Sequence, residues 1–153
     1  MILYRLSKAR YKNDLSGRGA EIAGGRWNGK GTAVVYTCES IALCNVEVAV
    51  RIPLGIIPSD YHLIHIELPE NCKIKTLKDK ELPHDWNSYP HSHSTQAIGD
   101  AFISGMKALV LKVPSAAVQG TFNYLINPFH KDMSLVKVIK TEEYSFDKRL
   151  FVR

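Results

Sequence analysis

Residues 24–47 read GGRWNGKGTAVVYTCESIALCNVE and join a glycine-rich loop, a β-branched run and an apolar segment that carries one carboxylate. Residues 32–37 (TAVVYT) predict a strand, because β-branched and aromatic side chains suit a pleated sheet. Ser40 is a good N-cap for a helix through about Val50. The valines that follow would also fit strand alternation. We favour a helix, since a strand comes just before it and Pro53 would end it.

Glu47 is the unusual residue of this stretch. Its neighbours Val46 and Val48 are apolar, and a buried carboxylate costs free energy unless a charge or a hydrogen-bond donor meets it. If the segment is helical, Arg51 lies one turn further along and would form an ordinary pair worth about 0.3 kcal/mol. Glu47 is therefore either paired structurally or kept for a ligand.

The glycine loop comes close to a phosphate-binding loop. Gly24, Gly29 and Lys30 match the pattern G-x-x-x-x-G-K. Gly31 stands where that pattern has Ser or Thr, and a strand follows where a helix is required. We therefore expect no triphosphate site and assign the glycines to tight turns near a ligand. Arg26 is a candidate for bidentate phosphate contact, although a surface ion pair with Asp or Glu explains it equally well.

Other polar residues carry weaker signals. Tyr36 points to one face of its strand, where its ring is either core or the floor of a pocket for a flat ligand. Ser115 ends an apolar strand, but no G-x-S-x-G motif or triad spacing accompanies it. His91 and His93 form an H-x-H pair without a further ligand, so we expect a polar loop and no metal site.

The remaining segments predict an α+β fold. A helix is expected from a cap at Ser94 to a stop at Gly105, and residues 7–25 are expected to be an irregular loop. Asn127-Pro128 is a turn signal. Strands are expected at 2–6, 61–68, 73–77, 108–113, 123–127 and 134–140. This order of elements predicts a mostly antiparallel or mixed β-sheet.

Composition limits the class of protein. A chain of 153 residues with 45% hydrophobic content suits one domain over residues 1–153. It has no apolar run long enough to span a membrane and no signal peptide, so we expect a cytoplasmic protein without a membrane partner. Its three cysteines form no C-x-x-C pair. The net charge of +5 favours anionic partners, but the scattered Lys and Arg argue against nucleic acid.

Eight short motifs, taken in order, resemble one family. They are YR at 4–5, GGRWN at 24–28, VVYT at 34–37, SIALCNVE at 40–47, TQAIG at 95–99, VPSA at 113–116, NYLINPFH at 123–130 and FDKRLF at 146–151. Together they resemble the RES-domain toxins, named for an arginine, a glutamate and a serine. Residues 51–93 carry little of this pattern, and we expect partner contacts or specificity there.

The resemblance implies an ADP-ribosyltransferase-like fold, in which a split β-sheet with flanking helices holds NAD⁺ in a cleft. It implies cleavage of the nicotinamide–ribose bond by phosphorolysis, which gives nicotinamide and ADP-ribose-1″-phosphate, or by hydrolysis. A mono-ADP-ribosyltransferase acting on a protein is the alternative. NAD⁺ is then the substrate, with no resident cofactor, and inorganic phosphate is a possible co-substrate.

The resemblance also assigns residues. The catalytic residues would be Glu47, Arg26 and Tyr36, and substrate binding would add Ser115, Asn127 and Trp27. Glu47 would accept hydrogen bonds from the ribose hydroxyls and stabilise the oxocarbenium-like charge. Arg26 would hold the pyrophosphate or the attacking phosphate, and Tyr36 would stack on the nicotinamide. Ser115 would bind a phosphate or an amide.

A partner is implied as well. Toxins of this kind inhibit growth and are encoded with an Xre-type helix-turn-helix antitoxin, which we expect to cover the active-site cleft. The chain shows no helix-turn-helix of its own, so we expect no direct DNA binding by it. A more distant alternative is a basic toxin that binds or cleaves RNA through Arg26, Lys30 and the histidines, which would show steeply salt-dependent RNA binding.

Overall fold

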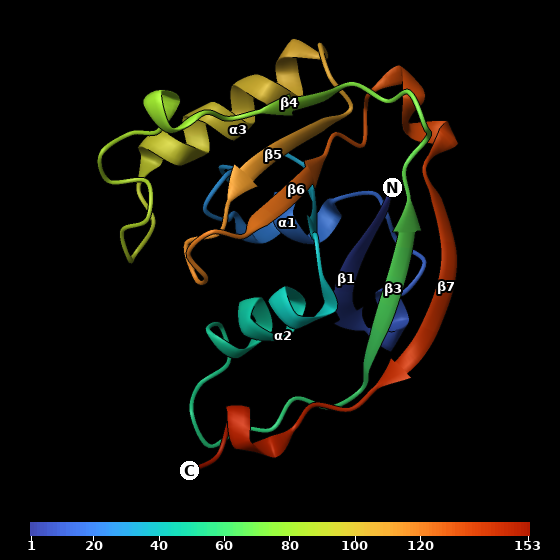
Figure 1. The fold of residues 1–153 in the computed structure, drawn as a ribbon, viewed down its shortest axis with the longest axis vertical. Helices are drawn as coiled ribbons and strands as arrows, with labels where there is room; N and C mark the ends of the chain where they lie inside the picture. The colour runs from blue at the N-terminus through green and yellow to red at the C-terminus, as the bar shows by residue number, and fades with distance from the viewer.

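Seven strands form one mixed sheet in the computed structural model, which describes residues 1–153 (Figure 1). The strands are β1 (Ile2–Lys8), β2 (Val35–Cys38), β3 (Tyr61–Glu67), β4 (Ile74–Thr76), β5 (Val110–Pro114), β6 (Phe122–Ile126) and β7 (Lys137–Tyr144). Their order across the sheet is β4-β5-β6-β2-β1-β3-β7. Only β4 and β5 run parallel, and the other neighbours are antiparallel. The predicted α+β class with a mostly antiparallel sheet is confirmed.

Three helices accompany the sheet: α1 (Arg18–Ala23), α2 (Ile41–Ala49) and α3 (His93–Gly105). The predicted cap of α2 is confirmed, because Ser40 Oγ accepts from the Leu43 amide at 3.1 Å. The predicted cap of α3 is wrong by two residues, since Ser92 is the N-cap. None of the helices is long and apolar enough to cross a membrane.

Two further sequence expectations are wrong. Residues 7–25 are not wholly irregular, because they contain α1 and a 3₁₀ turn at Ala9–Tyr11. With six residues, α1 is too short to show a helical period. The strand predicted at 134–140 is displaced to β7, because Lys131–Leu135 form a 3₁₀ turn.

The sheet is nearly divided between β1 and β2. These strands pair only at Tyr4 and Cys38, whereas β1 pairs with β3 along its whole length. The halves β4-β5-β6-β2 and β1-β3-β7 therefore diverge, and α2 lies beside the point of divergence (Figure 1). Helix α2, which carries Glu47, contacts both β1 and β2.

The core lies on both faces of the β5-β6-β2 half. On one face Val35 and Ile126 belong to a cluster that extends over β1 and β3. On the other face, Leu125 packs with residues of α3 such as Phe102. Because side chains alternate along a strand, Tyr36, which pairs with Leu125, lies on the α3 side.

Candidate functional site

The glycine loop is shaped by Asn28, whose side chain is fully buried. Its Nδ2 donates to the carbonyl oxygens of Ala20 at 2.8 Å and Thr32 at 2.9 Å. The Gly25 amide donates to the Asn28 carbonyl at 2.9 Å, which closes the loop on itself. Asn28 thus gives the loop a defined conformation through its own hydrogen bonds, a role that the motif spacing did not reveal.

Helix α3 holds the same loop through its polar side chains. Thr95 Oγ1 donates to the Arg26 carbonyl at 2.6 Å. Gln96 Nε2 donates to the Gly25 carbonyl at 3.1 Å. Gly99 permits the close approach, since a Cβ atom there would lie 1.5 Å from the Trp27 carbonyl oxygen. The TQAIG motif therefore supports the loop that carries Arg26.

Trp27 itself is a core residue. Only 2% of it is exposed, and it packs in the cluster that contains Phe102 and Ile103 of α3. The structure therefore places Trp27 under the loop and not at a surface open to a ligand, contrary to its expected role in substrate binding. Its place next to Arg26 in the GGRWN motif did not reveal this burial.

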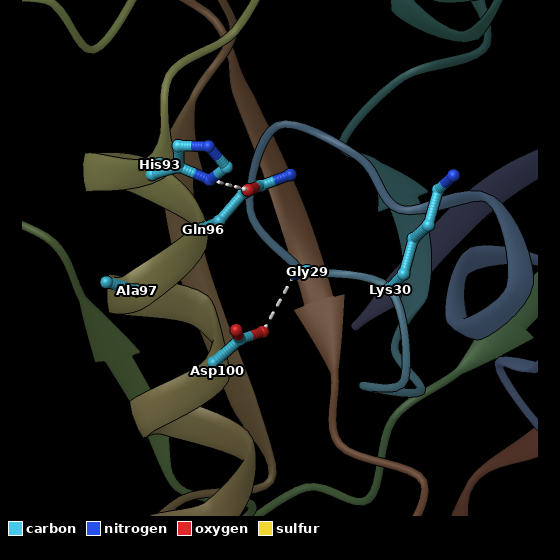
Figure 2. A pocket seen from close by; sticks show the side chains of 6 residues that line it. All are labelled: Gly29, Lys30, His93, Gln96, Ala97 and Asp100. Atoms are coloured by element: carbon cyan, nitrogen blue, oxygen red, sulfur yellow. Dashed lines mark hydrogen bonds between the residues drawn. The ribbon is translucent and has the colours of Figure 1, made fainter.

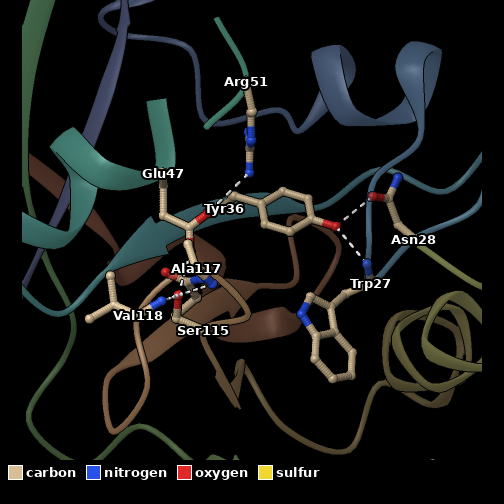
Figure 3. A network of polar contacts seen from close by, with 9 residues as sticks. Trp27, Asn28, Tyr36, Glu47, Arg51, Ser115, Ala117 and Val118 are labelled. Atoms are coloured by element: carbon tan, nitrogen blue, oxygen red, sulfur yellow. Dashed lines mark hydrogen bonds and ion pairs between the residues drawn. The ribbon is translucent and has the colours of Figure 1, made fainter. Parts of the chain in front are cut away.

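Tyr36 is anchored by its hydroxyl. The Oη atom donates to Asn28 Oδ1 at 2.7 Å and accepts from the Trp27 amide at 3.0 Å. In Figure 3 the hydroxyl points toward these two residues, and Glu47 lies on the other side of the ring. Burial raises the pKa of Tyr36 to about 12. The phenol is therefore neutral near pH 7 and unsuited to act as a base.

Glu47 is held at one oxygen and almost free at the other. Oε1 accepts from Ser115 Oγ at 2.8 Å and from Asn123 Nδ2 at 2.7 Å. Oε2 lies 3.8 Å from Nη2 of Arg51, whose side chain is 66% exposed. The i,i+4 pair exists, but it is long and exposed, so the two neutral donors define the carboxylate orientation (Figure 3).

Ser115 uses all its hydrogen-bonding capacity inside the protein. Its hydroxyl donates to Glu47 and accepts from the amides of Ala117 at 3.1 Å and Val118 at 3.2 Å. A hydroxyl has one donor and two acceptor positions, so none is left for a phosphate. The structure thus assigns Ser115 to the support of Glu47.

Arg26 points toward a distant part of the chain. Its Nη1 donates to the carbonyls of Trp86 at 2.9 Å and Ser88 at 2.8 Å. No carboxylate forms an ion pair with it, so the surface ion pair considered from sequence is absent. Burial lowers the pKa of Arg26, and the nearby carboxylate of Glu47 partly offsets this.

His91 joins this group from the segment that carries no recognisable motif. It lies on the surface, and partial burial lowers its pKa, as do the positive charges of Arg26 and Arg51. The sequence analysis assigned His91 to a polar loop, because His91 comes near these arginines only through the path of the chain after β4. We call Arg26, Tyr36, Glu47, Arg51, His91, Ser115 and Asn123 the Glu47 cluster.

Asn127 lies outside the Glu47 cluster. It is completely buried, its Nδ2 donates to the Ile103 carbonyl at 3.0 Å, and its Oδ1 accepts from the Phe129 amide at 3.0 Å. It therefore ties the end of α3 to the turn after β6. The asparagine that reaches Glu47 is Asn123 of the same NYLIN motif.

A separate hollow of about 460 Å³ lies between the glycine loop and α3 (Figure 2). It is lined by Gly29, Lys30, His93, Gln96, Ala97 and Asp100. Asp100 accepts from the Gly29 amide at 3.0 Å across it. The hollow includes no member of the Glu47 cluster. No group of three His, Cys, Asp or Glu side chains in the molecule could hold a metal ion.

Comparison with known proteins identifies relatives along nearly the whole chain. A family model described as the RES domain matches residues 2–147. The protein named Toxin Res of Photorhabdus laumondii is 36% identical over 152 residues, covering 98% of this chain and 97% of its own. The Prs ADP-ribosylating toxin of a Sphingobium species is 34% identical over 140 residues, covering 90% and 87%.

A solved structure shares the fold. The crystal structure of the MbcT–MbcA toxin–antitoxin complex of M. tuberculosis contains a chain that aligns with a TM-score of 0.73 at 21% identity, covering 94% of this chain and 84% of that one. Glu47 and Ser115, two of the site residues expected from the motifs, are joined by a hydrogen bond, and Arg26 lies nearby. The chain therefore belongs to the RES-domain family of toxins.

Proposed function

We propose that this chain is the toxin of a toxin–antitoxin pair and that it cleaves the nicotinamide–ribose bond of NAD⁺. The observation that carries the proposal is the Glu47 carboxylate, whose Oε1 has two donors while Oε2 has only the exposed Arg51 at 3.8 Å. A carboxylate held in one orientation with a spare oxygen is suited to a ligand.

The chemistry suits a fixed carboxylate. When the C1–N bond of the nicotinamide riboside breaks, the electron pair leaves with nicotinamide, and positive charge develops on the ribose ring. Oε2 of Glu47 accepts hydrogen bonds from the ribose hydroxyls and stabilises that charge, as carboxylates do in glycoside cleavage. No proton is needed on the leaving group, which agrees with the raised pKa of Tyr36, because it makes the phenol a poor proton donor.

The rest of the Glu47 cluster complements an anionic substrate. Arg26, Arg51 and His91 come from three separate segments and are close enough to affect one another electrostatically. We assign Arg26 to the pyrophosphate or to an attacking phosphate, because guanidinium groups bind phosphate with paired hydrogen bonds. The ring of Tyr36 stacks on the nicotinamide. Phosphate as acceptor yields ADP-ribose-1″-phosphate, and water yields ADP-ribose.

A second candidate is transfer of ADP-ribose to a protein. The Sphingobium relative is named as an ADP-ribosylating toxin. Bond cleavage is the same in both cases, and only the acceptor differs. In this alternative the protein side chain takes the place of phosphate beside the Glu47 cluster.

The partner that we propose is an Xre-type helix-turn-helix antitoxin that covers the Glu47 cluster. The solved structure with the same fold is a toxin–antitoxin complex, which supports a partner of this kind. An inhibitor is required because a free NAD⁺-consuming toxin would deplete its own host.

The test is a product assay with purified protein and NAD⁺, with and without inorganic phosphate, read by phosphorus NMR and chromatography. We expect nicotinamide release, and an ADP-ribose-1″-phosphate signal only when phosphate is present. Glu47→Gln should reduce the rate by about a thousandfold, whereas the exposed Glu70→Gln serves as the control. Absence of nicotinamide release, or unchanged release by Glu47→Gln, would contradict the proposal. Label on an added protein would favour the transferase.

A further inference from the structure

We propose that Asn123 is a positioning residue that fixes Oε1 of Glu47, so that Oε2 is the oxygen presented to the substrate. This inference rests on the proposed cleavage of NAD⁺. It adds a residue that is not part of the arginine, glutamate and serine for which the family is named. Asn123 acts through Glu47 and needs no contact with the substrate.

The position of Asn123 follows from the sheet. It pairs with Cys38 of β2 on one side and with Val113 of β5 on the other. It also shares the α3 side of β6 with Leu125, because it lies two residues away. From there its Nδ2 reaches Oε1 of Glu47 at 2.7 Å. The Asn123 donor is thus built into β6, an interior strand of the sheet.

Two donors on one oxygen restrict the carboxylate more than one donor does. Ser115, at the end of β5, and Asn123, on β6, approach Oε1 from adjacent strands. The side chain of Glu47 is 16% exposed, so water competes little for these bonds. Rotation of the carboxylate would break both bonds at once, which leaves Oε2 as the oxygen that is open to a ligand.

In this orientation the amide oxygen of Asn123 forms no hydrogen bond. Its Oδ1 is buried and has no hydrogen-bond partner. An unpaired buried acceptor costs free energy. The reversed amide would place Oδ1 against the negative Oε1, so the charge of Glu47 selects the observed orientation. An amide whose nitrogen bonds to Glu47 while its buried oxygen has no partner is better explained by the positioning of Glu47 than by stabilisation of the fold.

The first experiment compares Asn123→Asp and Asn123→Ala in the nicotinamide-release assay across pH. Asn123→Asp keeps the shape but replaces the donor by a second carboxylate. We expect kcat to fall about a hundredfold near pH 7.5, because a misoriented catalytic group costs this much, with KM for NAD⁺ within about threefold. Activity should recover as the pH is lowered, because one proton shared between the two carboxylates restores a donor.

Asn123→Ala is the second variant and removes the donor without adding charge. We expect a reduced kcat with the wild-type pH profile. The matched control is Asn45→Asp on α2, where the amide donates to the Tyr144 hydroxyl at 2.6 Å, and it should leave the pH profile unchanged. Wild-type kcat in Asn123→Ala, or identical pH profiles in the alanine and aspartate variants, would overturn the positioning role.

A second measurement does not depend on activity. Carbon-13 NMR of the carboxyl groups, followed across pH, should show one coupled titration of two carboxylates in Asn123→Asp that is absent from the wild type and from Asn45→Asp. Independent titration of the new aspartate would overturn the contact with Glu47. If the wild type releases no nicotinamide, the proposed function fails, while this titration still decides whether Asn123 holds Glu47.

Discussion

Asn123 and Asn127 stand at the two ends of β6, four residues apart, and they serve different purposes. Asn127 is fully buried and bonds to the backbone of Ile103 and Phe129 with both ends of its amide. Asn123 bonds to the carboxylate of Glu47 with one end and leaves the other unpaired. The asparagine at one end of the strand forms its hydrogen bonds with the backbone, and the asparagine at the other end forms its hydrogen bond with Glu47.

The difference shows how to separate structural from functional polar groups in this molecule. A buried amide that satisfies backbone groups on both sides stabilises the fold. A buried amide that is half satisfied and bonded to a charged side chain holds that side chain in place. Residue type and motif membership are identical for the two asparagines, so only the partners distinguish them.

The largest expected effect on stability is at the Asn127 end. Asn127→Ala leaves the Ile103 carbonyl and the Phe129 amide without their partners, so we expect a loss of about 3 kcal/mol in the free energy of unfolding. Asn123→Ala should lose less than about 1 kcal/mol, because its removal also removes the unpaired Oδ1. Urea unfolding measures both. Nicotinamide release per folded molecule should change only in Asn123→Ala.

The reverse pattern would break the comparison. If Asn127→Ala unfolded like the wild type and Asn123→Ala were the less stable protein, the amide at the Glu47 end would be structural. The positioning role would then lose its support.

Tyr36, which pairs with Leu125 midway between the two asparagines, gives an intermediate effect that depends on pH. Its folded-state pKa is about 12, above the ordinary value of about 10. The stabilisation is therefore fully present below pH 10 and is lost as the pH rises through 12. Two pKa units correspond to about 2 to 3 kcal/mol. Urea unfolding of the wild type at pH 8 and pH 11 should show about half of this loss, about 1.4 kcal/mol, because pH 11 lies midway between the two pKa values.

Tyr36→Phe should lack this part of the pH dependence, although it starts less stable by about 1 kcal/mol at pH 8, because its bonds to Asn28 and Trp27 are gone. Tyr89, which is 91% exposed, provides the control variant Tyr89→Phe. Equal pH dependence in the wild type and in Tyr36→Phe would mean that the Tyr36 hydroxyl is not buried in solution.

The smallest expected effect is at the open oxygen of Glu47. Arg51→Ala removes an exposed partner 3.8 Å from Oε2, and such pairs contribute little, so the free energy of unfolding should change by less than about 0.5 kcal/mol. Urea unfolding at low and high salt measures this. A loss above about 1 kcal/mol that disappears in high salt would make Glu47–Arg51 a structural pair and would weaken the case for a ligand at Oε2.

Much of the local structure could be predicted from neighbouring residues. The Ser40 cap determines where α2 begins, and β-branched and apolar alternation locates most of the strands. One cause explains both the displaced β7 and the unexpected α1. Short 3₁₀ and helical segments contain too few residues to show a periodic pattern of apolar side chains. The ordered motifs also identified the family before any geometry was known.

Which of the expected site residues lie together was predictable in part. Arg26, Tyr36, Glu47 and Ser115 are neighbours in the structure. The sequence could not show that Trp27 is core or that His91 comes close to two arginines. Each of these depends on contacts between segments that lie tens of residues apart, which residue types alone do not encode.

By itself, the sequence determined where most of the strands and the helix α2 form, because capping and alternation act between residues a few positions apart. It also determined which residue types are available to a site. Only the tertiary structure decided which donors meet Glu47. Ser115 and Asn123 lie 68 and 76 residues from it along the chain, and strand order and register alone bring both to the same oxygen.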